Sequence, residues 1–105
     1  LVGLIAPRVA EATYAAPLAQ GTVYIAPGGA RHMEVGGWPN GRVKLVAGEL
    51  SSGHRPSVDR VFHSAAASGA PCVGAILTGM GADGAAGLLA MRRAGAITFG
   101  QDEAT

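Results

Sequence analysis

Residues 72–99 read CVGAILTGMGADGAAGLLAMRRAGAITF, and the order of patterns within this stretch determines the fold class. Residues 72–77 form a continuous apolar run, which is typical of a parallel strand covered on both faces. A glycine-rich loop follows, then a helical pattern over residues 85–95, then a second short strand over residues 96–99. Strand, helix and strand in 28 residues match a right-handed βαβ crossover. The sequence therefore predicts an α/β fold with a parallel sheet, in which strand 72–77 is central and Cys72 lies in the core.

The residues before this unit predict a β-rich first half. Three β-prone stretches, 22–26, 32–35 and 42–46, are separated by glycine and proline, which favours a hairpin or a meander. Asn40-Gly41 is typical of a turn that needs positive φ. Residues 1–20 hold at most one strand and a loop. Much of the sheet that a central strand needs is therefore missing, and such a strand would favour association of copies through sheet edges.

One helix is predicted between the β-rich half and the βαβ unit. Apolar residues recur with helical spacing from Val58 to Ala66 and fall on one face. Pro56 fits the first turn of this helix, and Gly69 ends it.

The composition fits a single folded domain. The chain has 105 residues, a formal charge of +1, 49% hydrophobic residues and 14% charged residues, a balance that excludes intrinsic disorder. No apolar run approaches the roughly 18 residues that span a bilayer, so we expect a cytoplasmic protein without membrane insertion. Because the charge is near neutral and no basic cluster is present, nucleic acid is not an expected partner.

The glycine-rich loop allows three interpretations. Gly79, Gly81 and Gly84 spell G-x-G-x-x-G between a strand and a helix, and Asp102 or Glu103 follows at the distance expected of a dinucleotide site. Asp83 opposes this interpretation, because a carboxylate at the mouth of the helix repels phosphate. In the second interpretation Asp83 is the N-cap of the following helix, and its carboxylate accepts hydrogen bonds from the amides of residues 84–86. In the third interpretation Asp83 holds a histidine for acid-base chemistry, and spacing alone does not decide between the last two.

Four ordered blocks of this chain resemble the catalytic domain of bacterial chemotaxis protein-glutamate methylesterases. They read VYIAPGGARHM (23–33), GHRPSVD (53–59), LTGMGADGAAG (77–87) and FGQDEAT (99–105). The resemblance implies a doubly wound parallel sheet, Rossmann-like and three-layered, which is incomplete here and carries the hairpin in its first half. It also implies hydrolysis of glutamyl methyl esters on chemoreceptor helices, often with deamidation of glutamines, by a Ser-His-Asp triad without cofactor or metal. Whether a receiver domain belongs to the same protein stays open.

The resemblance assigns roles to individual residues. The aspartate of the family's GMGxDG motif falls on Asp83, which is expected to be the triad aspartate. Met80 matches the residue whose backbone lies beside the reacting carbonyl oxygen. Arg55 or Ser57 is expected to line the substrate groove.

The chain also departs from the family pattern. The family's serine lies in a glycine-rich loop and its histidine in a Gln-His-Met segment, and neither motif is present in this sequence. We therefore expect residues 1–105 to be an interior part of one catalytic domain, without its nucleophile-bearing N-terminal part or its C-terminal end. Because an aspartate without serine and histidine has nothing to orient, the chain alone is expected to be inactive. A dinucleotide- or phosphate-binding fragment and an inactive scaffold remain the alternatives.

Two further residues stand out. His32 lies at a predicted strand edge without a second ligand at fixed spacing, which favours a surface or hydrogen-bonded role over metal binding. Trp38 lies in a turn-rich loop, where a cap on the hairpin is favoured over an exposed anchor for a partner.

Overall fold

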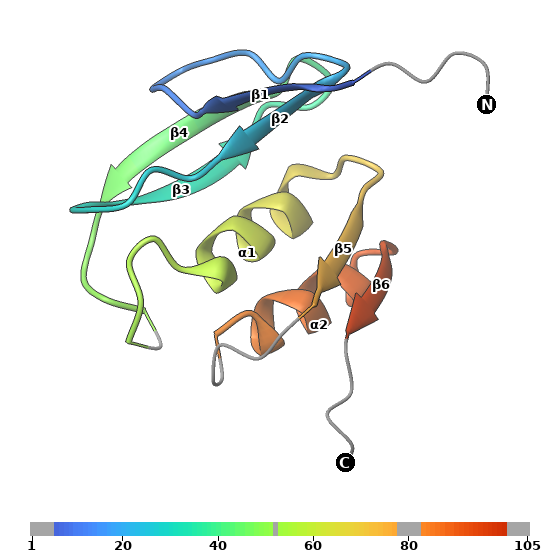
Figure 1. Cartoon of the computed structure of the whole chain (residues 1–105). Helices are drawn as coiled ribbons and strands as arrows, with labels where there is room; N and C mark the ends of the chain where they lie inside the picture. The colour runs from blue at the N-terminus through green and yellow to red at the C-terminus, as the bar shows by residue number, and fades with distance from the viewer. Residues whose placement is uncertain (1–5, 52, 78–82, 101–105) are drawn as a thin grey trace.

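The computed structural model describes residues 6–51, 53–77 and 83–100 and has an α/β fold (Figure 1). Among these residues the elements follow the order β1 (Arg8–Glu11), β2 (Thr22–Ile25), β3 (Arg31–Gly36), β4 (Arg42–Ala47), α1 (Val58–Ser68), β5 (Val73–Ile76), α2 (Ala85–Arg93) and β6 (Ile97–Gly100). The described strands pair as β1 with β2, β3 with β4 and β5 with β6. Helix α1 packs against both β3 and α2, so it joins the two halves of the chain.

The predicted βαβ unit is present. Strands β5 and β6 pair in parallel with Val73 opposite Ile97, and helix α2 connects them along the chain. Gly74 is buried on the side of α2, where a Cβ would lie 2.9 Å from Leu88 Cδ1. Helix and strand therefore pack closely here because this position has no side chain.

The predicted burial of strand 72–77 on both faces is wrong for the residues described. Strand β5 pairs only with β6 among the described strands, so it is not central there. Val73 and Leu77 are 63% and 75% exposed, and Ile97 and Phe99 of β6 are exposed as well. The apolar run identified a strand correctly, but among the described residues helices cover only one of its faces.

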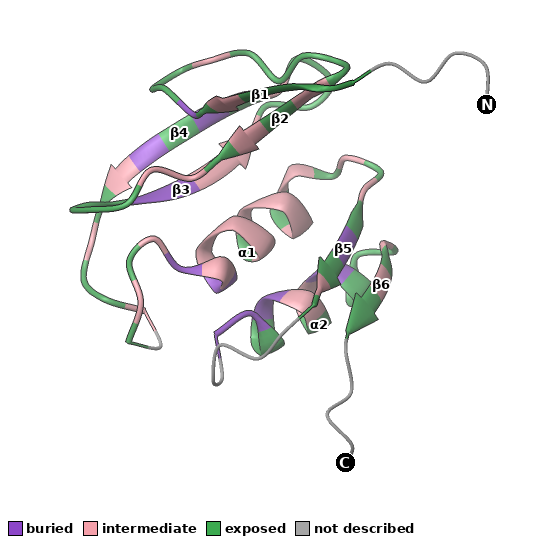
Figure 2. Cartoon of the chain, in the orientation of Figure 1, coloured by how far each residue is buried: buried purple, intermediate pink, exposed green. Residues whose placement is uncertain are grey.

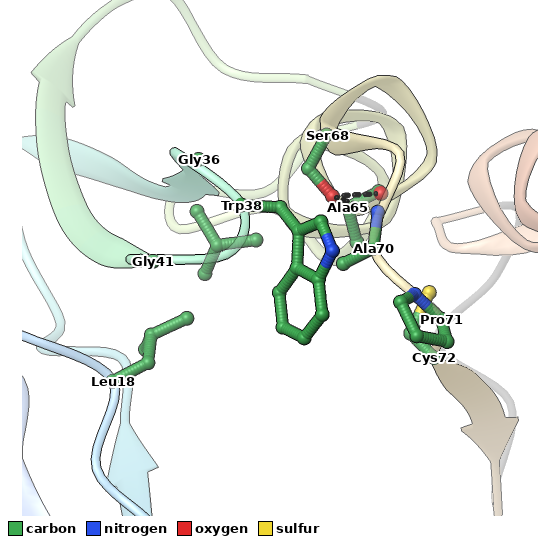
Figure 3. A pocket seen from close by; sticks show the side chains of 10 residues that line it. Leu18, Gly36, Trp38, Gly41, Ala65, Ser68, Ala70, Pro71 and Cys72 are labelled. Atoms are coloured by element: carbon green, nitrogen blue, oxygen red, sulfur yellow. Dashed lines mark hydrogen bonds between the residues drawn. The ribbon is translucent and has the colours of Figure 1, made fainter.

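Cys72 is partly buried rather than a core residue, because it precedes β5 instead of belonging to it. It contributes to the lining of an apolar pocket of about 220 Å³ beside the β3–β4 turn. Figure 3 shows the indole of Trp38 between Leu18 on one side and Pro71 with Cys72 on the other. Trp38 is 55% exposed, so it flanks this pocket and remains largely open to solvent.

The first half contains the predicted hairpin. Strands β3 and β4 are antiparallel, with Met33 opposite Leu45. Both residues are buried, together with Val43, and Figure 2 shows that buried residues concentrate in these strands and at the N-terminal ends of the two helices. Strand β2 does not extend the hairpin into a meander, because its described partner is β1, in parallel. The single strand expected in residues 1–20 is β1 in the part of this range that the structure describes.

Two local predictions need correction. Gly37, with φ of 84°, supplies the positive φ of the β3–β4 turn, rather than Asn40 or Gly41. Gly41 is instead required by space, since a Cβ there would lie 2.8 Å from Leu18 Cδ1. Helix α1 begins at Val58 with Ser57 as its N-cap, so Pro56 precedes the helix and does not form its first turn. Gly69 ends α1 in the left-handed conformation, as predicted.

Candidate active site

Asp83 lies where the C-terminal end of β5 meets the N-terminal ends of both helices. Its neighbour Gly84 packs closely on Ile76, the last residue of β5. A Cβ added at Gly84 would lie only 2.9 Å from Ile76 Cδ1. This edge of a parallel sheet is where the functional sites of open α/β folds are found. The chain thus places a carboxylate, 3% exposed, at the edge that such sites occupy.

The carboxylate of Asp83 caps α1, not α2. Asp83 Oδ1 accepts from Ser57 Oγ at 2.7 Å and from the Asp59 amide at 2.9 Å, and Oδ2 accepts from the Val58 amide at 2.8 Å. The N-cap of α2 is Gly84, which has no side-chain cap bond. The predicted N-cap role of Asp83 for its own helix is therefore wrong, because Asp83 precedes the cap position of α2.

Asp59 performs the complementary task for α2. Its Oδ1 accepts from the Gly87 amide at 2.7 Å, which satisfies one of the free amides in the first turn of α2. The two helices approach closely at this point, since a Cβ on Gly87 would lie 2.6 Å from Phe62 Cβ. Each helix therefore receives a carboxylate from the start of the other, and the glycines permit the contact.

The pKa of Asp83 lies below its ordinary value. Burial is the largest single influence and raises the pKa, but it is outweighed by the hydrogen bonds from the Asp59 amide, the Val58 amide and the Ser57 hydroxyl. The nearby charge of His54 lowers the pKa further. The carboxylate is consequently ionised at neutral pH although solvent barely reaches it.

Histidine, serine and aspartate meet at this site, but their connections are not those of a serine hydrolase. His32 Nδ1 accepts from the Ser57 backbone amide at 3.1 Å, and His32 Nε2 faces the Glu49 carbonyl oxygen at 2.6 Å. The Ser57 hydroxyl donates to Asp83 rather than to an imidazole. A nucleophilic serine must give its proton to a histidine nitrogen, so Ser57 and His32 do not form a catalytic pair.

Toward the residues that the structure describes, Asp83 uses three of its acceptor positions. A carboxylate offers about four lone-pair positions, and Asp83 uses two on Oδ1 and one on Oδ2 toward its described partners. The remaining position belongs to Oδ2. An additional N–H donor, such as an imidazole, fits the hydrogen-bonding capacity of this oxygen.

The other predicted site residues have different surroundings. Met80 lies outside the described residues, as do Gly79 and Gly81. Arg55 is exposed, and its guanidinium donates to the Gly29 and Gly48 carbonyl oxygens. It therefore connects the β2–β3 loop to the segment that leads into α1.

Ser57 differs most from its predicted role. It is 1% exposed, so its side chain does not line a groove in this structure. The sequence favoured either a surface position or a hydrogen-bonded role for His32. Its side chain has no exposed surface and is hydrogen-bonded to the Glu49 carbonyl oxygen, so the second of these roles is present. Within the described ranges, no group of three or more His, Cys, Asp or Glu residues could share a metal ion.

Comparison with known proteins identifies the family. A sequence model described as CheB methylesterase matches residues 2–105. The chain belongs to the CheB methylesterase family. It is 60% identical over 99 residues to protein-glutamate methylesterase/protein-glutamine glutaminase 1 of Caulobacter vibrioides, covering 93% of this chain and 29% of the relative. It is 56% identical over 104 residues to the second such protein of Bordetella avium, covering 97% of this chain and 30% of the relative.

A solved structure supports the fold of this CheB-family chain. The catalytic domain of the Thermotoga maritima CheB methylesterase superposes with a TM-score of 0.80 at 30% sequence identity. The superposition covers 90% of this chain and 51% of that domain. The chain thus spans about half of the solved domain and under a third of the curated relatives. Among the described residues, neither helix has the length and apolar character needed to cross a bilayer.

The site includes contacts that the sequence analysis missed. The bonds from Ser57 to Asp83 and from Gly87 to Asp59 join residues 26 and 28 positions apart. A partial signal was present, because Ser57 and Asp59 both precede or begin an apolar helical pattern, where capping residues are common. No local pattern indicated that the cap of α1 would come from Asp83, the residue before the N-cap of α2.

Proposed function

We propose that this chain supplies the catalytic aspartate of a protein-glutamate methylesterase, which hydrolyses glutamyl methyl esters and deamidates glutamines on chemoreceptor helices in bacterial chemotaxis. The observation that carries the proposal is the buried, ionised carboxylate of Asp83 at the C-terminal end of β5, whose Oδ2 accepts a single hydrogen bond from the described residues. The names of the relatives, which describe both activities, support the substrate class.

In the proposed mechanism Asp83 orients a histidine that lies outside this chain. The imidazole takes the proton of a serine hydroxyl as the serine attacks the ester carbonyl, and it gives that proton to the leaving methoxide oxygen, which departs as methanol. It then takes a proton from a water molecule that attacks the glutamyl-serine ester, and it returns the proton to the serine oxygen as glutamate is released. Asp83 holds the correct tautomer through Oδ2 and stabilises the imidazolium that forms. Met80 is assigned a place beside the carbonyl oxygen, and Arg55 is assigned to the substrate groove.

The serine and histidine are proposed to come from segments beyond the four blocks described above. Because Ser57 and His32 are connected otherwise, the chain alone is expected to be inactive. We also propose that residues 1–105 form part of one doubly wound, three-layer domain. Its missing segments would cover the exposed apolar face of β5 and β6, which this chain leaves open.

The dinucleotide alternative receives no support from the described geometry. Phosphate binding at the start of α2 needs free amides, but the Gly87 amide already donates to Asp59. A phosphate would also face the ionised carboxylate of Asp83 nearby.

A graft tests the proposed function. This chain replaces the stretch that it matches in the Caulobacter vibrioides relative, and release of methanol from methyl-labelled chemoreceptors is measured. The graft is expected to be active, and Asp83→Asn is expected to lower kcat by about 10³- to 10⁴-fold. Glu11→Gln removes an exposed carboxylate at the end of β1 and serves as the control, with activity unchanged. Equal activity of the Asp83→Asn graft and the parent graft would refute the proposal.

A further inference from the structure

We propose that Ser57 is a positioning residue for this reaction: its hydroxyl fixes the carboxylate of Asp83 so that Oδ2 is the oxygen offered to the histidine. The inference rests on the proposed function, because it assumes that Asp83 receives an imidazole. It gives Ser57 a role that differs from lining the substrate groove.

The hydrogen bonds of Ser57 are unusual for its position. A serine at the N-cap normally accepts from an amide in the first turn of its own helix. Ser57 is the N-cap of α1, with φ of −104° and ψ of 137°, yet it makes no such bond. Its hydroxyl donates to Asp83 Oδ1, and Asp83 accepts the first-turn amides instead. The start of α1 is therefore capped by a carboxylate 26 residues away in the sequence, and not by the side chain of its own N-cap residue.

Ser57 is itself held in place. Its backbone amide donates to His32 Nδ1, and the ring of His32 is anchored in turn by the Glu49 carbonyl oxygen at Nε2. These partners assign His32 the neutral tautomer with the proton on Nε2. Because Ser57 and His32 have almost no exposed surface, solvent does not compete for these bonds. The hydroxyl therefore points at Asp83 before any partner arrives.

The two oxygens of Asp83 are made unequal by this arrangement. Oδ1 accepts two hydrogen bonds, from Ser57 and from the Asp59 amide, whereas Oδ2 accepts one. Without the Ser57 hydroxyl, each oxygen would accept a single amide and each would keep a free position. An imidazole could then bind either oxygen, and its ring would no longer have one defined orientation.

The first experiment titrates the Asp83 carboxyl carbon by ¹³C NMR in the full chain. Ser57→Ala is expected to raise the titration midpoint by about one unit, because it removes a donor to the ionised form. Ser57→Thr keeps a hydroxyl and is expected to stay within about 0.3 unit of the parent. The matched control is Ser64→Ala, which removes a hydroxyl from the same helix that bonds the Val35 amide and the Val61 carbonyl oxygen. It is expected to lower stability and leave the midpoint unchanged.

The second experiment measures the same variants in the active graft. Per active site, Ser57→Ala is expected to lower kcat about tenfold while KM stays within about twofold, and Ser57→Thr is expected to restore kcat. An unchanged midpoint or an unchanged kcat for Ser57→Ala would overturn the positioning role. If instead the midpoint moves but Asp83→Asn leaves the graft active, the proposed function is overturned together with the role that depends on it, while the hydrogen bond itself stands.

Discussion

Replacing Asp83 with asparagine tests the site through folding, independently of catalysis. The substitution keeps the size of the side chain but replaces one acceptor oxygen with an NH₂ donor. If the nitrogen takes the place of Oδ2, it faces the Val58 amide; if it takes the place of Oδ1, it faces the Ser57 hydroxyl and the Asp59 amide. At least one buried donor is then left facing another donor.

The expected cost follows from these bonds. A hydrogen bond to a charged group contributes about 1.5–3 kcal/mol, and an unsatisfied buried donor costs about 1–3 kcal/mol. Because these terms are not additive, we expect Asp83→Asn to lower the free energy of unfolding by about 3 kcal/mol at pH 7. This is a large share of the roughly 5–15 kcal/mol that stabilises a typical domain.

Urea denaturation at several pH values provides the assay. The pKa of Asp83 is lowered in the folded state, so its stabilising contribution is complete above the unfolded pKa of about 3.9 and is lost as the pH falls through the lower folded pKa. The difference between parent and Asp83→Asn should therefore be greatest near neutral pH and shrink below about pH 4. Glu11→Gln, an exposed control, should remain within about 0.5 kcal/mol of the parent. A loss below about 0.5 kcal/mol for Asp83→Asn at pH 7 would refute the reasoning.

Three further outcomes are expected. Gly87→Ala should destabilise the chain by about 2 kcal/mol or more in urea denaturation, although alanine favours helices, because its Cβ would lie 2.6 Å from Phe62 Cβ; Gly28→Ala, with open space around it, is the control and should be nearly neutral. Sedimentation should show association of the isolated chain that Ile97→Lys and Phe99→Lys reduce, since these residues form part of an exposed apolar face; a monomer at all concentrations contradicts this. Calorimetric titration with NAD should give no binding heat at millimolar concentration, and saturable binding would revive the dinucleotide interpretation.

Local signals predicted much of the fold. The apolar periodicity of α1, its end at Gly69 and the hairpin of β3 and β4 depend on residues close together in the sequence, and all three are present. The parallel pairing of β5 with β6 followed from the length of the connection. The extent to which β5 is covered could not be predicted in this way, because an apolar run specifies a strand but not how many segments pack on it. The pairing of β1 with β2 likewise had no local signal.

The site was predicted only in part, and the reason is geometric. Asp83 was identified as the functional carboxylate from its motif. Capping preferences refer to residues that are neighbours in the sequence, so they predicted that Asp83 caps the helix that follows it, α2. Because Gly84 occupies the N-cap of α2 with φ of 99°, Asp83 lies one residue before the position from which a side chain caps that helix. Its bonds to α1 arise from the close packing of the two helices, which the sequence does not encode as a local pattern.

The choice of partners for Asp83 bears on what the carboxylate is able to do. A buried carboxylate needs compensation, and a bidentate arginine would provide it while neutralising the charge. Asp83 is compensated instead by two amides at the positive end of α1 and by a hydroxyl. Backbone amides and a hydroxyl stabilise the anion without removing its net charge. The carboxylate therefore stays ionised and still attracts a cation, which is the property that a developing imidazolium requires in the proposed reaction.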